Sequence, residues 1–369
     1  MNKSVTIITS EFPPGPGGIG NHSYNLAQWL STSDYRVKVV TDSRQAFFKN
    51  ESNFDKEISF KVERSERHRG ALVGIVSRSL LYFRAINTSS EHRVYLASGK
   101  FPIWFCGISS IFFPKKEFIA IVHGTEVNSQ KWFNRFYTKW CLRKMGFVIA
   151  VSSYTKSLVQ RLDSEIKVKV IPNGIDKNKF QNTNIYKKSD CGLSLITVGS
   201  VTNRKGQINV IKSLPLILKK NPKMMYHIVG LPIGKEKILK TAKSLKVENN
   251  ITLHGSLNDK KMIQILKSSD IFLMLSQESN SGDVEGFGIA ILEANYLGIP
   301  ALGSKNTGIE DAICDGFSGF LVDPHNPKQI GSCIEVILEN YEKYSKNAEK
   351  WARNFYWSKV IKSYIKVLS

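Results

Sequence analysis

Cysteine is scarce in this chain, and its cysteines form no recognisable pattern. Cys106, Cys141, Cys191, Cys314 and Cys333 lie far apart, without C-x-x-C or any other metal-ligand spacing. This odd, dispersed set argues against a disulfide framework and predicts reduced thiols in a cytoplasmic protein. We therefore expect stability to come from a hydrophobic core rather than from cross-links.

Long hydrophobic runs are also missing. The most apolar stretch, residues 103–113, contains Ser109 and Ser110 and is too short to span a bilayer. Residues 5–9 form too short an apolar run for a signal peptide and predict a first strand instead. No internal repeat or low-complexity tract is present. We expect a chain that does not cross a membrane.

Acidic residues are few compared with basic ones. The chain has 52 Lys and Arg against 31 Asp and Glu, a formal charge of +21. Residues 1–190 hold 29 basic and 15 acidic residues, a difference of +14, and the remainder holds 23 and 16, a difference of +7. Such an excess predicts attraction to nucleic acid, anionic lipid headgroups or a phosphorylated substrate. The alternative, a lysine-rich surface that serves only solubility, stays open.

The chain alternates short apolar runs with amphipathic stretches, which is typical of βαβ units and parallel sheets. Its 369 residues, with 42% hydrophobic and 22% charged residues, suit two globular domains better than one. We expect strands at residues 5–9, 37–40, 94–97, 118–123, 147–151, 168–171, 193–199, 225–230, 251–254 and 271–275. The helices expected in the first half cover residues 20–31, 129–144 and 153–162, and residues 341–368 are expected to be helical.

Two glutamates eight residues apart, Glu285 and Glu293, are the most informative feature. The glycines at 286 and 288 predict the entry to a helix that runs from Ile289 to Leu297. Helical side chains tilt toward the N-terminus, so Glu293 can lean back toward Glu285. The start of a helix also offers free N–H groups and a positive dipole end, which suit a phosphate.

This segment resembles the E-x7-E motif of the retaining family 4 glycosyltransferases, which have the GT-B fold. The similarity extends upstream to residues 282–284 and downstream through residues 298–300, 308–310 and 319–324. The resemblance implies two Rossmann-like parallel-sheet domains facing across a cleft, with a C-terminal helix that crosses back to the first domain. We place the acceptor-side domain at residues 1–176, the nucleotide-sugar domain at 177–345 and the returning helices at 346–369.

In the first domain, the resemblance concerns a glycine loop and a histidine. Gly17 and Gly18 follow the first strand, where glycine lets the backbone approach the donor phosphates closely. His123 ends a predicted strand, at the sheet edge where ligands bind in open α/β folds. The resemblance implies that His123 contacts the donor sugar. Glu126 is a weaker candidate for the acceptor side, and His22 is expected to have a capping or packing role.

In the second domain, the resemblance concerns a pair of cations. The family has Gly-Arg, four variable residues and Lys-Gly; Lys205 and Gly206 match, but Ser200 stands at the arginine position. Arg204 is the candidate replacement for the missing cation. Cations here would stabilise the charge that the departing nucleoside diphosphate gains. His254 lies where the family approaches the nucleotide base.

The resemblance implies a hexosyltransferase that moves a hexose or N-acetylhexosamine from a UDP- or GDP-sugar to a glycan or lipid-linked acceptor, as in O-antigen or capsule synthesis. Glu285 and His123 would contact the sugar and Glu293 the ribose. The N–H groups of Phe287, Gly288 and Ile289 would bind the phosphates. No D-x-D motif is present, so we expect neither a metal ion nor a cofactor.

Residues 129–144 allow two interpretations. Lys131, Arg135, Lys139 and Arg143 recur near helical spacing, with five aromatic residues between them. Such a helix can lie in a headgroup interface, or its aromatics can enter the core, which we favour. Together with a basic cluster (Arg64, Arg67, His68 and Arg69), the helix predicts peripheral contact with the inner face of the plasma membrane.

Two other functions remain open. A nucleotide-sugar epimerase shares the architecture but needs no acceptor, so release of nucleoside diphosphate without acceptor would favour it. The positive charge alone would also suit a nucleic-acid-binding protein. No RRM, KH, zinc-finger or helix-turn-helix pattern accompanies it, which argues against nucleic acid.

Overall fold

The computed structural model describes residues 3–43, 48–66, 71–88, 93–180 and 192–369. The chain forms two compact units: unit 1 is Met1–Gly174 with Trp357–Ser369, and unit 2 is Ile175–Tyr356. The chain therefore passes from unit 1 to unit 2 after Gly174, two residues before the predicted domain boundary at residue 176. The return begins at Trp357 rather than at residue 346, because residues 346–356 pack with unit 2.

Unit 1 contains a seven-stranded sheet in the order β3-β2-β1-β4-β5-β6-β7, and neighbouring strands pair in parallel. All six strands predicted for this part of the chain are confirmed, and β3 is additional. Because β1 pairs with both β2 and β4, the strand order reverses direction at β1. The strands are β1 (Lys3–Thr9), β2 (Tyr35–Asp42), β3 (Lys61–Ser65), β4 (Val94–Ser98), β5 (Glu117–Val122), β6 (Phe147–Ala150) and β7 (Val168–Val170).

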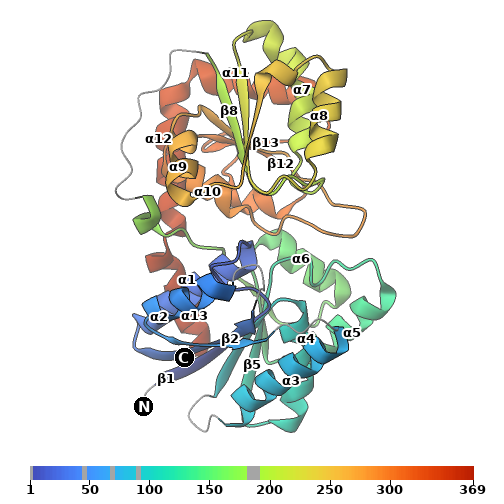
Figure 1. Cartoon of the computed structure of the whole chain (residues 1–369), viewed down its shortest axis with the longest axis vertical. Coiled ribbons are helices and arrows are strands. Elements are labelled where there is room, and N and C mark those ends of the chain that lie inside the picture. Colours follow the sequence, from blue (N-terminus) through green and yellow to red (C-terminus); the bar gives the residue numbers. More distant parts are fainter. Residues whose placement is uncertain (1–2, 44–47, 67–70, 89–92, 181–191) are drawn as a thin grey trace. The chain divides into compact units, whose positions relative to one another are not determined.

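Seven helices among the described residues belong to unit 1 (Figure 1). The apolar stretch at residues 103–113 lies almost wholly in α4, a helix partly buried beside the sheet. Ser152 caps the N-terminus of α6, because its hydroxyl accepts a hydrogen bond from the Thr155 N–H. The helices are α1 (Gly18–Ser31), α2 (Phe48–Glu57), α3 (Ala71–Asn87), α4 (Lys100–Phe112), α5 (Trp132–Lys144), α6 (Ser153–Leu162) and α13 (Trp357–Leu368).

The interpretation of residues 129–144 as a core helix is wrong. The side chains of Trp132, Phe133 and Phe136 on α5 are 77%, 57% and 64% exposed. Only Thr138, Cys141 and Leu142 of this helix are buried, so the face with which it packs on α4 is narrow. The basic cluster also needs correction, since the Arg64 side chain is buried between Glu51 and Asp55. Arg67, His68 and Arg69 lie outside the described residues.

Unit 2 contains a six-stranded sheet in the order β10-β9-β8-β11-β12-β13, again with parallel neighbours. The four strands predicted here are confirmed, whereas β12 and β13 were not predicted. Its core gathers side chains such as Leu195, Tyr226 and Ile271 from the sheet and Ile211 from α7. The strands are β8 (Ser194–Val198), β9 (Met225–Val229), β10 (Ile251–Gly255), β11 (Ile271–Met274), β12 (Ala301–Ser304) and β13 (Gly319–Val322).

The helices of unit 2 connect and cover these strands (Figure 1). They are η2 (Lys177–Phe180), α7 (Gln207–Lys220), α8 (Lys235–Ser244), η3 (Glu248–Asn250), α9 (Asp259–Lys267), α10 (Ile289–Tyr296), η4 (Gly308–Ala312), α11 (Pro327–Glu339), α12 (Tyr341–Ala352) and η5 (Arg353–Phe355). The helical tail predicted at residues 341–368 is thus two helices, interrupted where Tyr356 is extended and bridges to Ile175.

The last helix, α13, is anchored in unit 1 by its buried face. Trp357 is 1% exposed and lies against Gly174, where an added Cβ would come within 2.6 Å of the indole ring. Farther along, the Tyr364 hydroxyl lies 2.9 Å from Nε2 of His22 on α1. The packing and capping role expected for His22 is therefore a contact with the returning helix.

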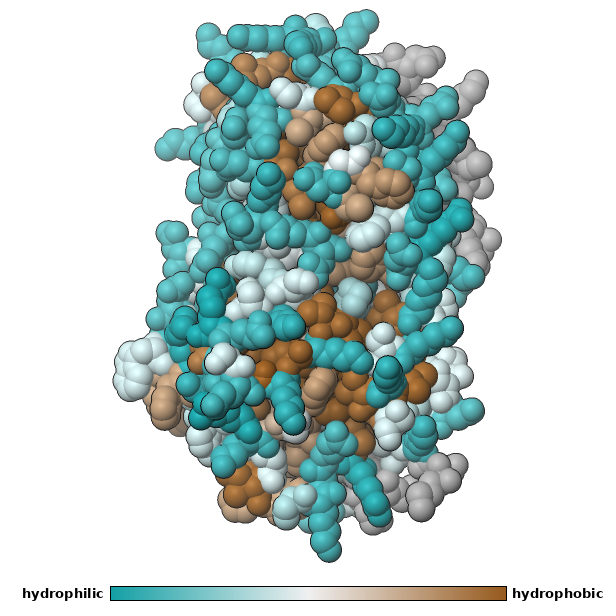
Figure 2. Space-filling view, turned by 180° about the vertical axis from the view of Figure 1, so that it is seen from behind, coloured by the Kyte–Doolittle hydropathy of each residue, from teal (hydrophilic) through white to brown (hydrophobic). Residues whose placement is uncertain are grey.

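One face of the molecule is largely hydrophilic. Figure 2 shows teal, hydrophilic residues over most of one face, with brown, hydrophobic residues reaching the surface between them. No helix among the described residues is long and apolar enough to cross a membrane. The four cysteines that the structure describes, Cys106, Cys141, Cys314 and Cys333, are free thiols.

Candidate active site

In unit 2, the predicted functional residues lie where the strand order reverses. Strand β8 pairs with β9 on one side and β11 on the other. The loop after β8 carries Arg204 and Lys205, and the loop after β11 carries Glu285. Open α/β sheets bind ligands at this position, outside the carboxyl ends of the strands. The fold therefore brings together residues that are about 80 positions apart in the sequence.

These two loops are held together by backbone contacts. The Gln277 N–H donates to the Arg204 carbonyl at 3.0 Å, and the Asn209 side-chain amide donates to the Leu275 carbonyl at 3.1 Å. Gly206 sits between them with φ at +72°, and a Cβ there would lie 1.7 Å from the Leu275 oxygen. Only glycine permits this conformation and this approach. Gly206 is thus required locally, because it lets the loop carrying Lys205 close on the end of the next strand.

Glu285 is the electrostatic centre of this loop pair. Its residue exposure is 9%; it forms an ion pair with Lys205 at 2.8 Å and another with Arg204. Burial alone would raise the pKa of Glu285, but Lys205 and Arg204 outweigh it and lower the pKa. Glu285 is therefore a buried carboxylate that stays ionised because two cations neutralise it.

The helix after this loop begins as the glycine spacing predicts. Gly288 adopts the left-handed conformation, with φ at +84°, and α10 starts at Ile289. The helix ends at Tyr296, one residue before the predicted end. Phe287 is buried at 2% exposure and packs at 5.9 Å from the Phe355 ring, so its side chain anchors the turn while its backbone leads into the helix.

Glu293 lies on α10 with a cation that sequence reasoning missed. Its carboxylate accepts a hydrogen bond from Lys179 Nζ at 2.8 Å, and Lys179 also lies 3.5 Å from Asp259. Burial would lower the pKa of Lys179, but the two carboxylates raise it. Lys179 is 114 residues away in a stretch without periodicity, so no sequence pattern pointed to it. Glu285 and Glu293 therefore have different cationic partners.

His254 also has an unforeseen partner. It lies on β10, and its Nε2 is 3.1 Å from Nδ1 of His227 on β9. Burial lowers the pKa of both rings, and for His227 the neighbouring His254 lowers it further. The two rings face the same side of neighbouring parallel strands, a pairing that cannot be inferred before the strand order is known.

In unit 1, His123 lies just after β5 in a buried polar cluster. Its Nε2 is 2.9 Å from the Ser98 hydroxyl at the end of β4, and its ring lies 5.1 Å from that of His22. Its backbone N–H donates to Glu126 at 3.0 Å. Burial lowers the pKa of His123 to about 4, and burial raises the pKa of Glu126 to about 7. The cluster thus favours neutral forms of its titratable groups.

The glycine loop of unit 1 lies at the start of α1. An added Cβ at Gly17 would meet the Glu11 carboxylate at 1.9 Å, whereas a Cβ at Gly18 would meet nothing within 4 Å. The Glu11 carboxylate is the end of a flexible side chain and can move aside, so packing does not require glycine at either position. Because α1 begins at Gly18, this open backbone is also a helix N-terminus.

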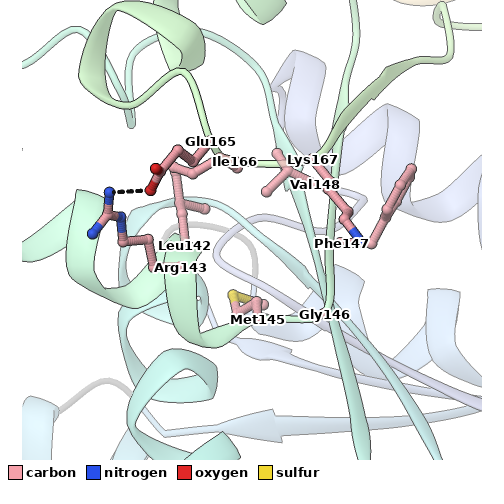
Figure 3. Close-up of a pocket in the computed structure, with 9 residues that line it drawn as sticks. All are labelled: Leu142, Arg143, Met145, Gly146, Phe147, Val148, Glu165, Ile166 and Lys167. Carbon is pink, nitrogen blue, oxygen red and sulfur yellow. Dashed lines mark hydrogen bonds and ion pairs between the residues drawn. The ribbon is translucent and has the colours of Figure 1, made fainter.

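A cavity of about 370 Å³ lies elsewhere in unit 1. It is lined by the end of α5, the beginning of β6 and the segment before β7, and the Arg143–Glu165 ion pair lies beside it (Figure 3). It therefore lies at the amino ends of the strands, opposite the edge that carries His123. Nothing connects this cavity with the predicted site residues. Among the residues that the structure describes, no group of three or more His, Cys, Asp or Glu side chains could hold a metal ion.

Two protein-family models together match almost the whole chain. The family model for glycosyl transferases group 1 matches residues 177–355, and that for glycosyltransferase family 4 matches residues 16–179. A mannosyltransferase of Corynebacterium glutamicum, described as GDP-mannose-dependent and acting on a monoacylated phosphatidylinositol monomannoside, is 23% identical and matches 92% of this chain and 90% of its own.

Solved structures agree on the fold. HepE of Anabaena, in complex with UDP and glucose, has a TM-score of 0.77 at 21% identity, covering 98% of this chain and 99% of its own. The lipopolysaccharide outer core galactosyltransferase WaaB has a TM-score of 0.74 at 15% identity, covering 99% of both chains. At these identities the similarity establishes the architecture, and the parallel-sheet fold predicted from the sequence is confirmed.

Proposed function

Since the chain belongs to the family 4 glycosyltransferases with the GT-B fold, we propose that it is a retaining hexosyltransferase. The donor is a nucleoside-diphosphate hexose or N-acetylhexosamine, and the acceptor is a glycan or lipid-linked glycan of a bacterial surface polysaccharide such as O-antigen or capsule. The observation that carries the proposal is the cation pair of Arg204 and Lys205, beside the Glu285 carboxylate at the reversal point of the unit 2 sheet.

The proposed roles follow from this charge arrangement. Lys205 and Arg204 bind the donor diphosphate, helped by the N–H groups from Phe287 to Ile289 at the start of α10. Glu293 binds the ribose, and His254 lies near the base. Glu285 contacts the sugar hydroxyls. In unit 1, Gly17 and Gly18 offer backbone to the phosphates and His123 contacts the sugar, while Glu126 serves the acceptor side.

In the proposed reaction, the bond between the anomeric carbon and the diphosphate oxygen breaks, and its electron pair stays on that oxygen. The acceptor oxygen bonds to the same carbon on the same face, and its proton passes to the departing phosphate. Cations that bind the leaving group act more strongly in the transition state than in the ground state. We propose that these cations carry the leaving-group charge without a metal ion or cofactor.

A thermal-shift panel of UDP, GDP, ADP and their sugars tests the proposal. A ligand at a hundredfold excess over its Kd adds about 2.7 kcal/mol of stability, so one nucleoside diphosphate should raise the melting temperature selectively. Lys205→Ala should abolish that shift, whereas replacement of the exposed Lys212 on α7 should preserve it. Absence of a shift with every nucleotide would contradict the proposal.

The proposed lipid-linked acceptor is supported by one surface of unit 1. Twelve large apolar side chains on three helices are exposed, and we refer to them as the α3–α5 surface. Helix α4 contacts both α3 and α5. The members are Leu72, Val73, Ile75, Val76, Leu80 and Phe83 of α3, Ile108, Ile111 and Phe112 of α4, and Trp132, Phe133 and Phe136 of α5.

Basic side chains accompany this apolar surface. Lys131 and Arg135 are exposed beside the aromatics of α5, and Lys100 lies 4.9 Å from the Trp104 ring on α4. Exposed apolar residues gathered on neighbouring helices are typical of interaction sites, and basic residues with aromatic neighbours suit an anionic headgroup interface. We propose that the α3–α5 surface contacts the cytoplasmic leaflet, where a lipid-linked acceptor is found.

Vesicle co-sedimentation tests this contact. The protein should bind vesicles containing phosphatidylglycerol more tightly than neutral ones, and a triple substitution of Trp132, Phe133 and Phe136 by Ser should weaken binding at least tenfold. As a matched control, replacement of Ile233 and Leu239, exposed apolar residues of unit 2, by Ser should leave binding unchanged. Equal binding by the triple variant would exclude these aromatics as membrane contacts.

A further inference from the structure

Glu285 forms ion pairs with Arg204 and Lys205, the same two cations that we propose bind the donor diphosphate. The side chains of Glu285, Lys205 and Arg204 are 11%, 14% and 28% exposed, so this cluster is largely removed from water. In such surroundings a carboxylate 2.8 Å from an ammonium group is not replaced by water without cost. An entering phosphate must therefore compete with the Glu285 carboxylate for the same donors.

Burial makes this competition specific. Two clustered cations in a partly buried loop repel each other, and an anion between them relieves the repulsion. Glu285 supplies that anion from within the chain. A diphosphate brings the same kind of charge, so it can replace Glu285 and leave the cations neutralised. One anion is exchanged for another, and the loop is never left with unpaired cations.

We propose that Glu285 is an internal substitute for the donor diphosphate, which holds Arg204 and Lys205 in place while the site is empty and moves to the sugar when the donor binds. The inference rests on the proposed function and goes beyond it, because it assigns Glu285 a second role that opposes nucleotide binding. The same carboxylate contacts the sugar only after the phosphates have released it.

This exchange has consequences for affinity. When a binding-competent state is only a fraction of the free protein, the apparent Kd rises by the inverse of that fraction. Pairing of Glu285 with the cations reduces the competent fraction and weakens binding of free nucleoside diphosphate. After transfer, no donor sugar remains to hold Glu285, and its return to the cations favours product release.

Isothermal titration calorimetry with UDP, GDP and ADP tests the inference on the full chain. Glu285→Gln keeps the size of the side chain and removes its charge, so the preferred diphosphate should bind about tenfold more tightly, although sugar transfer falls. Glu335→Gln is the matched control, because Glu335 forms an ion pair with Lys220 at a more exposed place in the same unit. The affinity of the Glu335→Gln variant for the diphosphate should stay within twofold of that of the wild type.

Stability provides a second measurement. Without ligand, Glu285→Gln leaves Arg204 and Lys205 unneutralised, so the melting temperature of this variant should be lower than that of the wild type. Saturating diphosphate should raise the melting temperature of the variant by more than that of the wild type. Glu285→Ala should behave in the same way if the glutamine variant does not fold.

The outcomes separate the two proposals. If the wild type binds a diphosphate and neither Glu285 variant binds it more tightly, the substitute role is overturned while the proposed function stands. If the wild type binds none of UDP, GDP and ADP, the proposed function is overturned, and the inference with it.

Discussion

The two units place polar groups at the same kind of position, the carboxyl ends of a parallel sheet, but control their charge in opposite ways. In unit 2, Glu285 is buried and ionised because Lys205 and Arg204 neutralise it. In unit 1, Glu126 is buried at 3% exposure, and its pKa rises to about 7 because burial outweighs its backbone hydrogen bonds. His123 beside it is held neutral by burial.

Burial alone therefore does not decide whether a carboxylate at a strand end is charged. Glu285 and Glu126 are both buried, and the difference between them is that Glu285 forms close ion pairs with Lys205 and Arg204. Unit 2 should consequently respond to anions and to salt, whereas unit 1 should respond to pH. The charged cluster of unit 2 is consistent with the proposal that this unit binds a diphosphate.

The largest expected effect is on the charged side of the comparison. Lys205→Ala and Glu285→Ala should each lower kcat/KM by about 100-fold or more, because each removes a contact that is stronger in the transition state. Steady-state kinetics with the donor identified by thermal shift measures this loss. Lys212→Ala should retain normal rates, and near-normal rates in either site variant would remove the charge cluster from the mechanism.

The second prediction concerns Glu126. Its folded pKa is about 7, above the ordinary value of 4.5, so the folded state holds a proton that the unfolded state releases between these pH values. Its contribution to stability is thus complete below pH 4.5 and is lost as the pH rises through 7. Between pH 5 and pH 8, the free energy of unfolding of Glu126→Gln should therefore rise by on the order of 2 kcal/mol relative to that of the wild type.

Chemical denaturation at both pH values measures this difference. Burial lowers the pKa of His123 to about 4 and also lowers the pKa of His22. Both histidines are present in the variant and the wild type, so their opposite contribution to the pH dependence of stability cancels in the comparison. A stability difference between variant and wild type that stays constant with pH would show that Glu126 is charged when folded, as Glu285 is.

The smallest effect concerns the anchor of unit 1. Tyr364→Phe removes the hydroxyl that contacts His22 Nε2 and should destabilise the protein by about 1 kcal/mol, the net contribution of a typical intramolecular hydrogen bond. Tyr35→Phe is the control: the Tyr35 hydroxyl is buried and has no hydrogen-bond partner among the described residues. It should cost less than Tyr364→Phe in the same denaturation experiment, and equal losses would contradict the proposed anchor.

Sequence interpretation succeeded for features that depend on neighbouring residues and failed for contacts between segments that are distant in the sequence. The turn at Gly288 and the start of α10 at Ile289 were predicted correctly because both depend on neighbouring residues and on glycine. The partners Lys179 of Glu293 and His227 of His254 were missed, because each pair joins distant segments. Trp132 and its aromatic neighbours on α5 were misplaced because apolar residues at helical spacing do not reveal whether another element covers them.

The sequence by itself determined the alternation of strands and helices, the parallel character of the sheets and the motif that links Glu285 with Glu293, because these depend on spacing and local backbone preference. The tertiary structure decided which charges meet. Arg204 and Lys205 face Glu285 only because β8 and β11 are neighbours, and Glu126 has its raised pKa because the fold buries it without an ion pair like those of Glu285 among the described residues. Charge state depends on surroundings that only folding creates.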